Sequence, residues 1–389
     1  MTQTTGVSIE LESVVKQYRG QEKPAVKELS LTIGAGETVA IVGPSGCGKT
    51  TTLKMINRLI EPTSGRILID GSDATKADAD DLRQGIGYVV QAGGLFPHWS
   101  VEKNVAAVPG LLGWKKDRAH QRVTELLELV GLDPATFRGR FPKEMSGGQQ
   151  QRVGVARALA ADPPVLLMDE PFGAVDPITR VRLQDQLLSI QDDLHKTIVI
   201  VTHDVDEAIK LADRVLILSE GGHIEQFATP EEILTAPAND FVEEFVGSGA
   251  TLKHLSLSTV ADIESIPLVF ATPGSPADEA ADRAQAVGEN WVIVVDENGA
   301  PRAWPSVSEV RSKPVISQYV DKRLPVVERS ATLADALDIM LAASQGGVLI
   351  VHRNKVIGAL TIAQVTDRIQ ERQALVNPEL AADTYRAAP

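Results

Sequence analysis

The chain has 389 residues and 43% hydrophobic content, enough for two or three domains with packed interiors. Its formal net charge of −14 repels nucleic-acid phosphates and anionic lipid headgroups, which excludes a general nucleic-acid or membrane-surface role unless a local basic patch exists. No apolar run approaches the roughly 18 to 20 residues that cross a bilayer, the polar start lacks the features of a signal peptide, and we expect a cytoplasmic chain.

The first predicted elements form a short antiparallel sheet. Residues 7–33 alternate apolar and polar side chains and carry turn signals, which is typical of paired strands. Tyr18 ends one of these strands, where an aromatic ring can stack on a nucleotide base. A tyrosine at a strand end more often simply packs against its neighbours, so both interpretations stay open.

A candidate phosphate-binding loop follows. It matches G-x-x-x-x-G-K-[ST] between an apolar strand and a helical segment, which is the context that the motif requires. The loop consists of Gly43, Pro44, Ser45, Gly46, Cys47, Gly48, Lys49, Thr50 and Thr51. The glycines let backbone N–H groups turn toward phosphate oxygens at the positive end of the following helix. We expect Lys49 to reach the β- and γ-phosphates and Thr50 to ligate Mg²⁺. The alternative is a glycine-rich turn without a ligand.

Cys47 is the single cysteine of the chain, which excludes an intrachain disulfide and a cysteine zinc site. We interpret it as a small filler of the tight turn rather than as a redox group.

Gln91 ends a predicted apolar strand that begins at Ile86. A glutamine at the carboxyl end of a strand can reach a Mg²⁺ ion or an attacking water across a crevice. A surface glutamine is the alternative.

The pattern turns helical from Leu95 to about Asp162. Inside this insert stand Ser146, Gly147, Gly148 and Gln149. Ser146 is a good N-cap, and the glycine pair lets the backbone approach an anion at the start of a helix. A plain capped helix fits these residues equally well.

Two later apolar strands end in polar side chains. The run 165–168 ends in Asp169 and Glu170, and the run 197–201 leads to His203. Unbroken apolar runs are typical of strands buried on both faces, so these side chains are expected in the crevice at the carboxyl edge of a parallel sheet. There Asp169 suits a Mg²⁺ partner, Glu170 a base for the attacking water, and His203 a donor to the γ-phosphate. Acidic residues that only cap a strand, and a structural or exposed histidine, are the alternatives.

These pieces, in this order, resemble the nucleotide-binding subunit of an ABC transporter over residues 8–246. The resemblance implies an α/β P-loop NTPase fold, with a RecA-like core, an antiparallel β subdomain and a helical ABC subdomain, and it implies ATP and Mg²⁺ as cofactors. It assigns adenine stacking to Tyr18, Walker A to 43–51, the Q-loop to Gln91, the signature to 146–149, Walker B to Asp169, the catalytic glutamate to Glu170, the D-loop to Asp176 and the switch histidine to His203. The leucine usual before the signature serine is Met145 here, a conservative change.

The same resemblance implies partners. Two copies are expected to face each other head to tail, with each ATP between Walker A of one copy and the signature of the other. A membrane permease is expected to dock near Gln91 and residues 95–99, although core packing is an equally open role for Phe96 and Trp99. An extracytoplasmic substrate-binding protein takes part only indirectly, and no nucleic acid is expected.

Three further sequence segments narrow the resemblance to one subfamily of ABC transporters. Leu-Phe-Pro-His at 95–98, Asp-Glu-Pro-Phe-Gly-Ala at 169–174 and Thr-His-Asp-Val-Asp-Glu-Ala at 202–208 are similar to the ATPase subunits of osmoprotectant importers. Those importers carry glycine betaine, choline, carnitine and related quaternary amines. This substrate assignment rests on analogy, because no residue of the chain need touch the solute.

Three alternatives stay open. They are an ATPase subunit for another small solute, a soluble ABC ATPase acting on DNA or ribosomes, and a sensor with a vestigial ATPase. The second would carry a long coiled coil, two fused ATPase halves or a basic face, and the sequence has none of these. The intact motif set opposes the third.

The last third of the chain repeats itself without gaps at an offset of 56 residues, which places Leu268 on Leu324 and Asn298 on Asn354. Each copy has a short strand, an alanine-rich helix and two further strands, and the pair resembles tandem CBS domains, an α+β module. We predict an ABC ATPase domain at 1–246 with its helical subdomain at about 93–163, a linker at 247–252, CBS copies at 253–311 and 312–373, and a disordered tail at 374–389.

The CBS copies depart from the nucleotide-binding pattern G-x-x-T-x-x-D. The second copy has Thr361 but carries Gln364 at the acidic position, and the first has Pro305 and Ser308 at the corresponding places. No carboxylate is thus available there for ribose hydroxyls, which opposes classical AMP or ATP binding. Two interpretations stay open: a dimerisation and regulatory module that senses ionic strength or a cyclic dinucleotide, and a structural brace.

Overall fold

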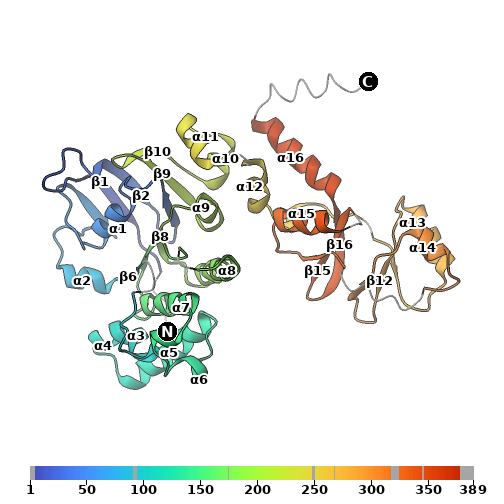
Figure 1. Cartoon of the computed structure of the whole chain (residues 1–389), viewed down its shortest axis with the longest axis horizontal. Helices are drawn as coiled ribbons and strands as arrows, with labels where there is room; N and C mark the ends of the chain where they lie inside the picture. Colours follow the sequence, from blue (N-terminus) through green and yellow to red (C-terminus); the bar gives the residue numbers. More distant parts are fainter. Residues whose placement is uncertain are drawn as a thin grey trace. The chain divides into compact units, whose positions relative to one another are not determined.

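The computed structural model describes residues 5–90, 94–173, 175–247, 250–266, 268–316, 324–343 and 346–376. The chain divides into two compact units, 1–247 and 248–389, and each is described by itself (Figure 1). Among the described residues, no helix combines the length and the apolar character needed to cross a membrane.

Six strands form the central sheet of the first unit, in the order β10-β9-β3-β8-β7-β6. Their bounds are β3 Thr38–Val42, β6 Ile86–Val89, β7 Val165–Asp169, β8 Thr197–Val201, β9 Arg214–Ser219 and β10 His223–Ala228. All neighbours pair in parallel except β9 and β10. Every residue of β7 and β8 is buried, which confirms the prediction from their apolar runs.

The middle of this sheet determines where the polar strand ends lie. β8 pairs with β3 on one side and with β7 on the other. Because all three strands run in the same direction, the loops after their carboxyl ends meet at one edge of the sheet.

A second sheet, β2-β1-β4-β5, pairs antiparallel throughout and confirms the short antiparallel sheet expected near the start. Its strands are β1 Ile9–Lys16, β2 Val26–Ile33, β4 Ser64–Ile69 and β5 Ser72–Asp73. Leu29 and Ile33 of this sheet share one hydrophobic core with Val39 and Val165 of the central sheet.

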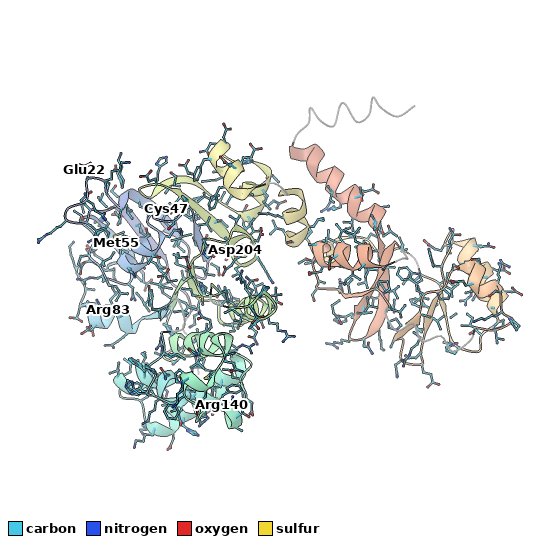
Figure 2. All side chains as sticks on the ribbon, viewed as in Figure 1. Glu22, Cys47, Met55, Arg83, Arg140 and Asp204 are labelled. Carbon is cyan, nitrogen blue, oxygen red and sulfur yellow. The ribbon has the colours of Figure 1, made fainter. Side chains whose placement is uncertain are left out.

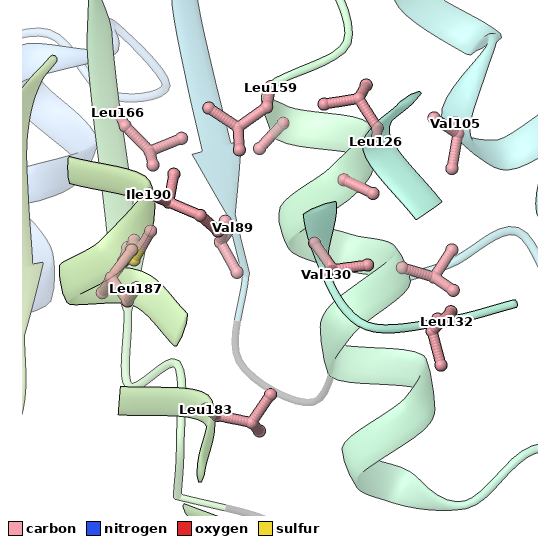
Figure 3. Close-up of a cluster of buried hydrophobic side chains, with 14 of the residues drawn as sticks. Val89, Val105, Leu126, Val130, Leu132, Leu159, Leu166, Leu183, Leu187 and Ile190 are labelled. Carbon is pink, nitrogen blue, oxygen red and sulfur yellow. The ribbon is translucent and has the colours of Figure 1, made fainter. Parts of the chain in front are cut away.

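Helices cover the rest of the first unit. They are α1 Lys49–Ile56, α2 Ala79–Gln84, α3 Val101–Val105, α4 Ala107–Leu111, α5 Lys116–Leu129, α6 Pro134–Phe137, α7 Gly147–Ala158, α8 Pro177–Leu194, α9 Val205–Leu211, α10 Pro230–Thr235 and α11 Asp240–Val246, with a 3-10 turn at Pro142–Glu144. The run α3 to α7 confirms the predicted helical insert. Leu126 and Val130 of this insert share a second hydrophobic core with Leu187 and Ile190 of α8, as Figure 3 shows.

The second unit contains two copies of one strand–helix–strand–strand–helix order. The first is β11 Phe270–Ala271, α13 Ala277–Ala286, β12 Ile293–Val295, β13 Pro301–Ala303 and α14 Val307–Arg311, and the second is β14 Val326–Glu328, α15 Leu333–Ala342, β15 Gly347–His352, β16 Lys355–Thr361 and α16 Ile362–Val376. The offset of the sequence repeat holds for the first strands and for the helices that follow them. β13 is shorter than β16 and begins at Pro301, because proline cannot donate to a strand ladder.

Before the first copy lie α12, Ala250–Leu257, and a 3-10 turn, Val260–Asp262. Leu255 and Val260 pack in one core with Leu333 and Met340 of the second copy. The segment that begins the unit is thus packed on the copy farther along the chain. The domain boundaries stay predictions, and residues 377–389 of the predicted tail lie outside the described residues.

Candidate nucleotide-binding and catalytic site

The phosphate loop joins β3 to α1 and needs glycine for steric reasons. Gly48 has a φ of 110°, in the left-handed region, and a Cβ there would lie 2.6 Å from the carbonyl oxygen of Ala25. Lys49 bends back over the loop, and its Nζ donates to the carbonyl oxygens of Gly43 at 2.7 Å and Pro44 at 3.0 Å. The loop therefore collects a cation and the N-terminal end of α1, which suits an anion.

The loop faces the ends of the neighbouring strands across a cleft of about 360 Å³. The cleft is lined by Ser45, Gly46, Gly48, Lys49, Thr50, Thr51, Glu170 and His203. Residues far apart in the sequence are thus brought together at the sheet edge, in a cleft of the size that small-molecule sites have.

Thr50 and Asp169 place two side-chain oxygen atoms together beside this cleft. The Thr50 hydroxyl donates to Asp169 Oδ1 at 2.9 Å, and Asp169 is almost fully buried at the end of β7. Among the residues that the structure describes, no group of three or more His, Cys, Asp or Glu side chains could hold a metal ion by itself. A hydroxyl and a carboxylate fit Mg²⁺, which takes few protein ligands and completes its shell with water and phosphate oxygens.

Glu170 stands at a strained position directly after β7. Its φ is 45°, which is uncommon for a residue with a side chain, and its N–H donates to the carbonyl oxygen of Val201 at 2.8 Å. Its Oε1 lies 3.3 Å from His203 Nδ1. The strained backbone thus holds a carboxylate and an imidazole side by side at the edge of the cleft.

Cys47 lies within the phosphate loop (Figure 2) and is 1% exposed. A Cβ on Gly43 would come within 2.8 Å of its sulfur, so the side chain fills the turn. Burial raises the pKa of the Cys47 thiol, and nearby Lys49 offsets this only in part. A buried neutral thiol agrees with the predicted filler role.

The stretch 146–149 is not part of the cleft lining. Ser146 is the N-cap of α7, as predicted, and accepts from Gln149 N at 3.3 Å, while Gln149 Oε1 accepts from Ser146 N at 3.0 Å. Ser146 and Gly147 are exposed. A Cβ on Gly148 would lie 2.8 Å from Thr179 Cγ2, so α7 packs closely on the first turn of α8. That helix is N-capped by Asp176, which accepts from Thr179 N at 3.0 Å.

Comparison with known proteins identifies this arrangement. A model of the ABC transporter family matches residues 26–173, and a CBS domain model matches residues 307–371. The osmoprotectant import ATP-binding protein OsmV of Salmonella typhimurium is 50% identical over 78% of this chain and 80% of its own length. The glycine betaine/carnitine/choline transport ATP-binding protein OpuCA of Bacillus subtilis is 44% identical over 93% of this chain and 96% of its own length.

The chain belongs to the ATP-binding proteins of ABC importers for osmoprotectants. The predicted family and its ABC-type ATPase activity are confirmed, and the comparisons do not favour the alternatives. A solved dimeric ATP-binding cassette in a post-hydrolysis state with ADP and Pi covers 57% of this chain and 98% of its own, at 35% identity and a TM-score of 0.52. The P-loop fold and a C-terminal CBS domain are confirmed with the family.

Tyr18 of this ABC ATPase lies just after β1 and is 36% exposed. Lys16 Nζ lies 5.1 Å from the centroid of its ring. Ala25 N donates to Lys16 O at 2.8 Å, and Ala25 O is the atom that Gly48 approaches. The turn that carries Tyr18 is therefore anchored next to the phosphate loop, although Tyr18 itself does not line the cleft.

Gln91, the predicted Q-loop residue, lies outside the described residues. The segment after it is held by Asn104, which is fully buried. Asn104 Oδ1 accepts from Phe96 N at 2.8 Å, and its Nδ2 donates to the carbonyl oxygens of Phe96 at 3.2 Å and Trp99 at 3.1 Å. The centroids of the Phe96 and Trp99 rings lie 4.5 Å apart, and Phe96 is exposed. Sequence reasoning missed Asn104, because its only signal is a polar residue on the apolar face of a short helix.

Cys47 allows a direct test of the loop geometry, since the chain has one thiol. We expect Ellman's reagent to label the native protein on the order of a hundredfold more slowly than the unfolded chain, because the thiol is buried and its pKa is raised. Mg-ATP should slow the reaction further. Labelling of one thiol per chain in denaturant is the control, and equal rates in the native and unfolded states would contradict the buried filler.

Proposed function

We propose that this chain hydrolyses ATP to drive import of quaternary-amine osmoprotectants through a partner membrane permease. The support for the substrate class is the set of relatives named for osmoprotectant, carnitine, choline and glycine betaine transport. The observation that carries the catalytic part is the meeting of the phosphate loop, Asp169, Glu170 and His203 at one sheet edge.

In this proposal the phosphate-loop residues and Lys49 bind the ATP phosphates. Lys49 exchanges its two carbonyl partners for phosphate oxygens, since its ammonium already lies inside the loop. Thr50 and Asp169 hold Mg²⁺, which when bound neutralises charge on the phosphates. Gln91 is proposed as a further ligand of the ion.

Glu170 accepts a proton from the attacking water while the β–γ phosphate bond breaks. His203, whose imidazole lies beside that carboxylate, donates to the γ-phosphate and keeps Glu170 directed at the cleft. Tyr18 stacks on the adenine from the neighbouring turn.

The signature 146–149 is proposed to serve the ATP of a second copy of the chain, and Asp176 to lie at the contact between the copies. Support comes from the exposure of Ser146 and Gly147 and from their absence from the cleft lining of their own chain. The solved ATP-binding cassette described above and a further solved cassette are dimeric. The Ser146 hydroxyl and the N-terminus of α7 then face a γ-phosphate from the other side.

The permease is proposed to dock on the segment that Asn104 holds, with exposed Phe96 as a contact. This contact keeps the chain at the cytoplasmic face of the cell membrane as a peripheral subunit. An extracytoplasmic substrate-binding protein acts through the permease.

The CBS module is proposed to be regulatory without classical AMP binding. Gln364 is already engaged: its Oε1 accepts from Thr361 N at 3.0 Å, and its Nε2 donates to the carbonyl oxygen of Glu264 at 2.8 Å. An amide used to cap α16 and to hold a neighbouring segment is not free for ribose hydroxyls. A cyclic dinucleotide or ionic strength is the proposed signal, and a ligand-free brace is the remaining alternative.

Replacing Glu170 with Gln removes the proton acceptor but keeps the size of the side chain. We expect ATP binding to persist, a closed ATP-bound dimer to accumulate, and turnover to fall by about a hundredfold or more. Steady-state phosphate release and size-exclusion chromatography measure both effects, with the exposed Glu220→Gln as the control. Near-normal hydrolysis by Glu170→Gln would remove Glu170 from the role of base.

Reconstitution tests the transport function. The chain is incorporated into vesicles with the membrane protein that co-purifies with it, and ATP turnover is measured with betaine, choline, carnitine and unrelated solutes. We expect stimulation by quaternary amines alone. Stimulation only by an unrelated solute would contradict the substrate class.

Calorimetry on the full chain tests the CBS module. With ATP held at saturation, we expect no tight binding of AMP and binding of a cyclic dinucleotide if the module is regulatory. Tight AMP binding that Gln364→Ala abolishes would contradict the capping role assigned to Gln364.

A further inference from the structure

His203 lies on a short loop, and its own side chain is too exposed for packing to fix its position. The side chain is 66% exposed, and the loop spans only residues 202–204 between β8 and α9. An exposed imidazole on so short a connection takes its position from the backbone on either side of it. The two flanking residues, Thr202 and Asp204, therefore decide where His203 lies.

Thr202 is held by a hydrogen bond to the buried carboxyl group of Glu207. Its hydroxyl donates to Glu207 Oε2 at 2.8 Å and accepts from Asp204 N at 3.1 Å. Thr202 is 2% exposed and Glu207 is 5% exposed. A single buried side chain on α9 thus fixes the residue before His203, and through it the backbone after His203.

Asp204, labelled in Figure 2, is held by α9 and by Arg180. As N-cap of α9 it accepts from Asp206 N at 3.0 Å and Glu207 N at 3.3 Å, and its Oδ2 lies 3.4 Å from Arg180 Nη1. Arg180 Nη2 also donates to Val175 O at 3.4 Å. Arg180 therefore links the histidine loop to the segment that runs from Glu170 to α8.

Charged side chains surround Glu207, so its protonation state affects the electrostatics of the histidine loop. Asp204, Arg180 and His203 surround it, and its Oε1 has no hydrogen-bond partner within the described part of the chain. Burial raises the pKa of Glu207 to about 7, although the hydrogen bond from Thr202 opposes the shift. Below that pH the group is neutral, and above it a buried charge appears next to Asp204.

We propose that Glu207 and Arg180 are positioning residues for ATP hydrolysis, which hold the two sides of His203 and so keep its imidazole beside Glu170. The inference rests on the function proposed above for His203. It assigns a task to two side chains that do not line the cleft.

Four variants test the proposal in the full chain: His203→Ala, Glu207→Ala, Glu207→Gln and Arg180→Gln. We expect Glu207→Ala and Arg180→Gln to lower kcat by about tenfold to a hundredfold while the Kd for ATP changes little, because the loop moves but the phosphate loop does not. Glu207→Gln should keep most of the activity at pH 6.5, since its amide oxygen still accepts from Thr202. The exposed neighbours on the same two helices, Asp206→Asn and Arg182→Gln, are the matched controls.

Two readouts separate positioning from general stability. First, the double variant Glu207→Ala, His203→Ala should be no slower than His203→Ala alone, because both changes remove one interaction. Second, the ratio of wild-type kcat to that of Glu207→Gln should fall as the pH rises through about 7, since only the wild type acquires the buried charge.

The outcomes distinguish the two proposals. A normal kcat for His203→Ala overturns both. A low kcat for His203→Ala with normal kcat for Glu207→Ala and Arg180→Gln overturns only the positioning role, as do losses that multiply in the double variant. If Glu207→Ala does not fold, Arg180→Gln and the pH profile of Glu207→Gln still decide.

Discussion

The parallel pairing of β3, β8 and β7 is the constraint on which the candidate site depends. Each strand is buried on both faces, so its register is fixed by the hydrophobic cores above and below the sheet. Fixed register brings the phosphate loop, Asp169 and His203 to one edge although they are far apart in the sequence. The 2.9 Å hydrogen bond between Thr50 and Asp169 is a direct consequence of that pairing. It joins the helix that follows β3 to the carboxyl end of β7.

Sequence alone could predict the parts of the site that have a local pattern. The phosphate loop is a contiguous motif with its own strand and helix, and the apolar runs before Asp169 and His203 indicate buried strands that end in a crevice. The 56-residue repeat likewise predicted two copies of one unit, since identical spacing produces identical element order.

The supporting side chains could not be predicted in the same way. Arg180 meets Asp204 across 24 residues of sequence, and Asn104 serves backbone groups whose positions exist only in the folded loop. Glu207 was visible as part of a subfamily phrase, but its burial and its hydrogen bond to Thr202 depend on how α9 packs. The packing of Leu255 on the second CBS copy was also not predictable, because the sequence of a short helix does not indicate which copy it covers.

The cleft of a single chain is lined by the phosphate loop, Glu170 and His203, and Asp169 lies beside it, hydrogen-bonded to Thr50. The exposed residues at the start of α7, which form the predicted signature, do not line this cleft. We therefore propose that each ATP site is shared between two copies of the chain. Gly148 packs on the first turn of α8, the helix that follows Glu170 in the same chain.

Complementation between two inactive variants tests this shared site most directly. Lys49→Ala damages only the phosphate loop, and Ser146→Arg damages only the signature, so each homodimer is expected to be inactive. Mixed dimers contain one site built from the intact loop of one copy and the intact signature of the other. We predict that mixing the two variants restores ATP hydrolysis, and a mixture that forms mixed dimers yet stays as inactive as its components would contradict the shared site.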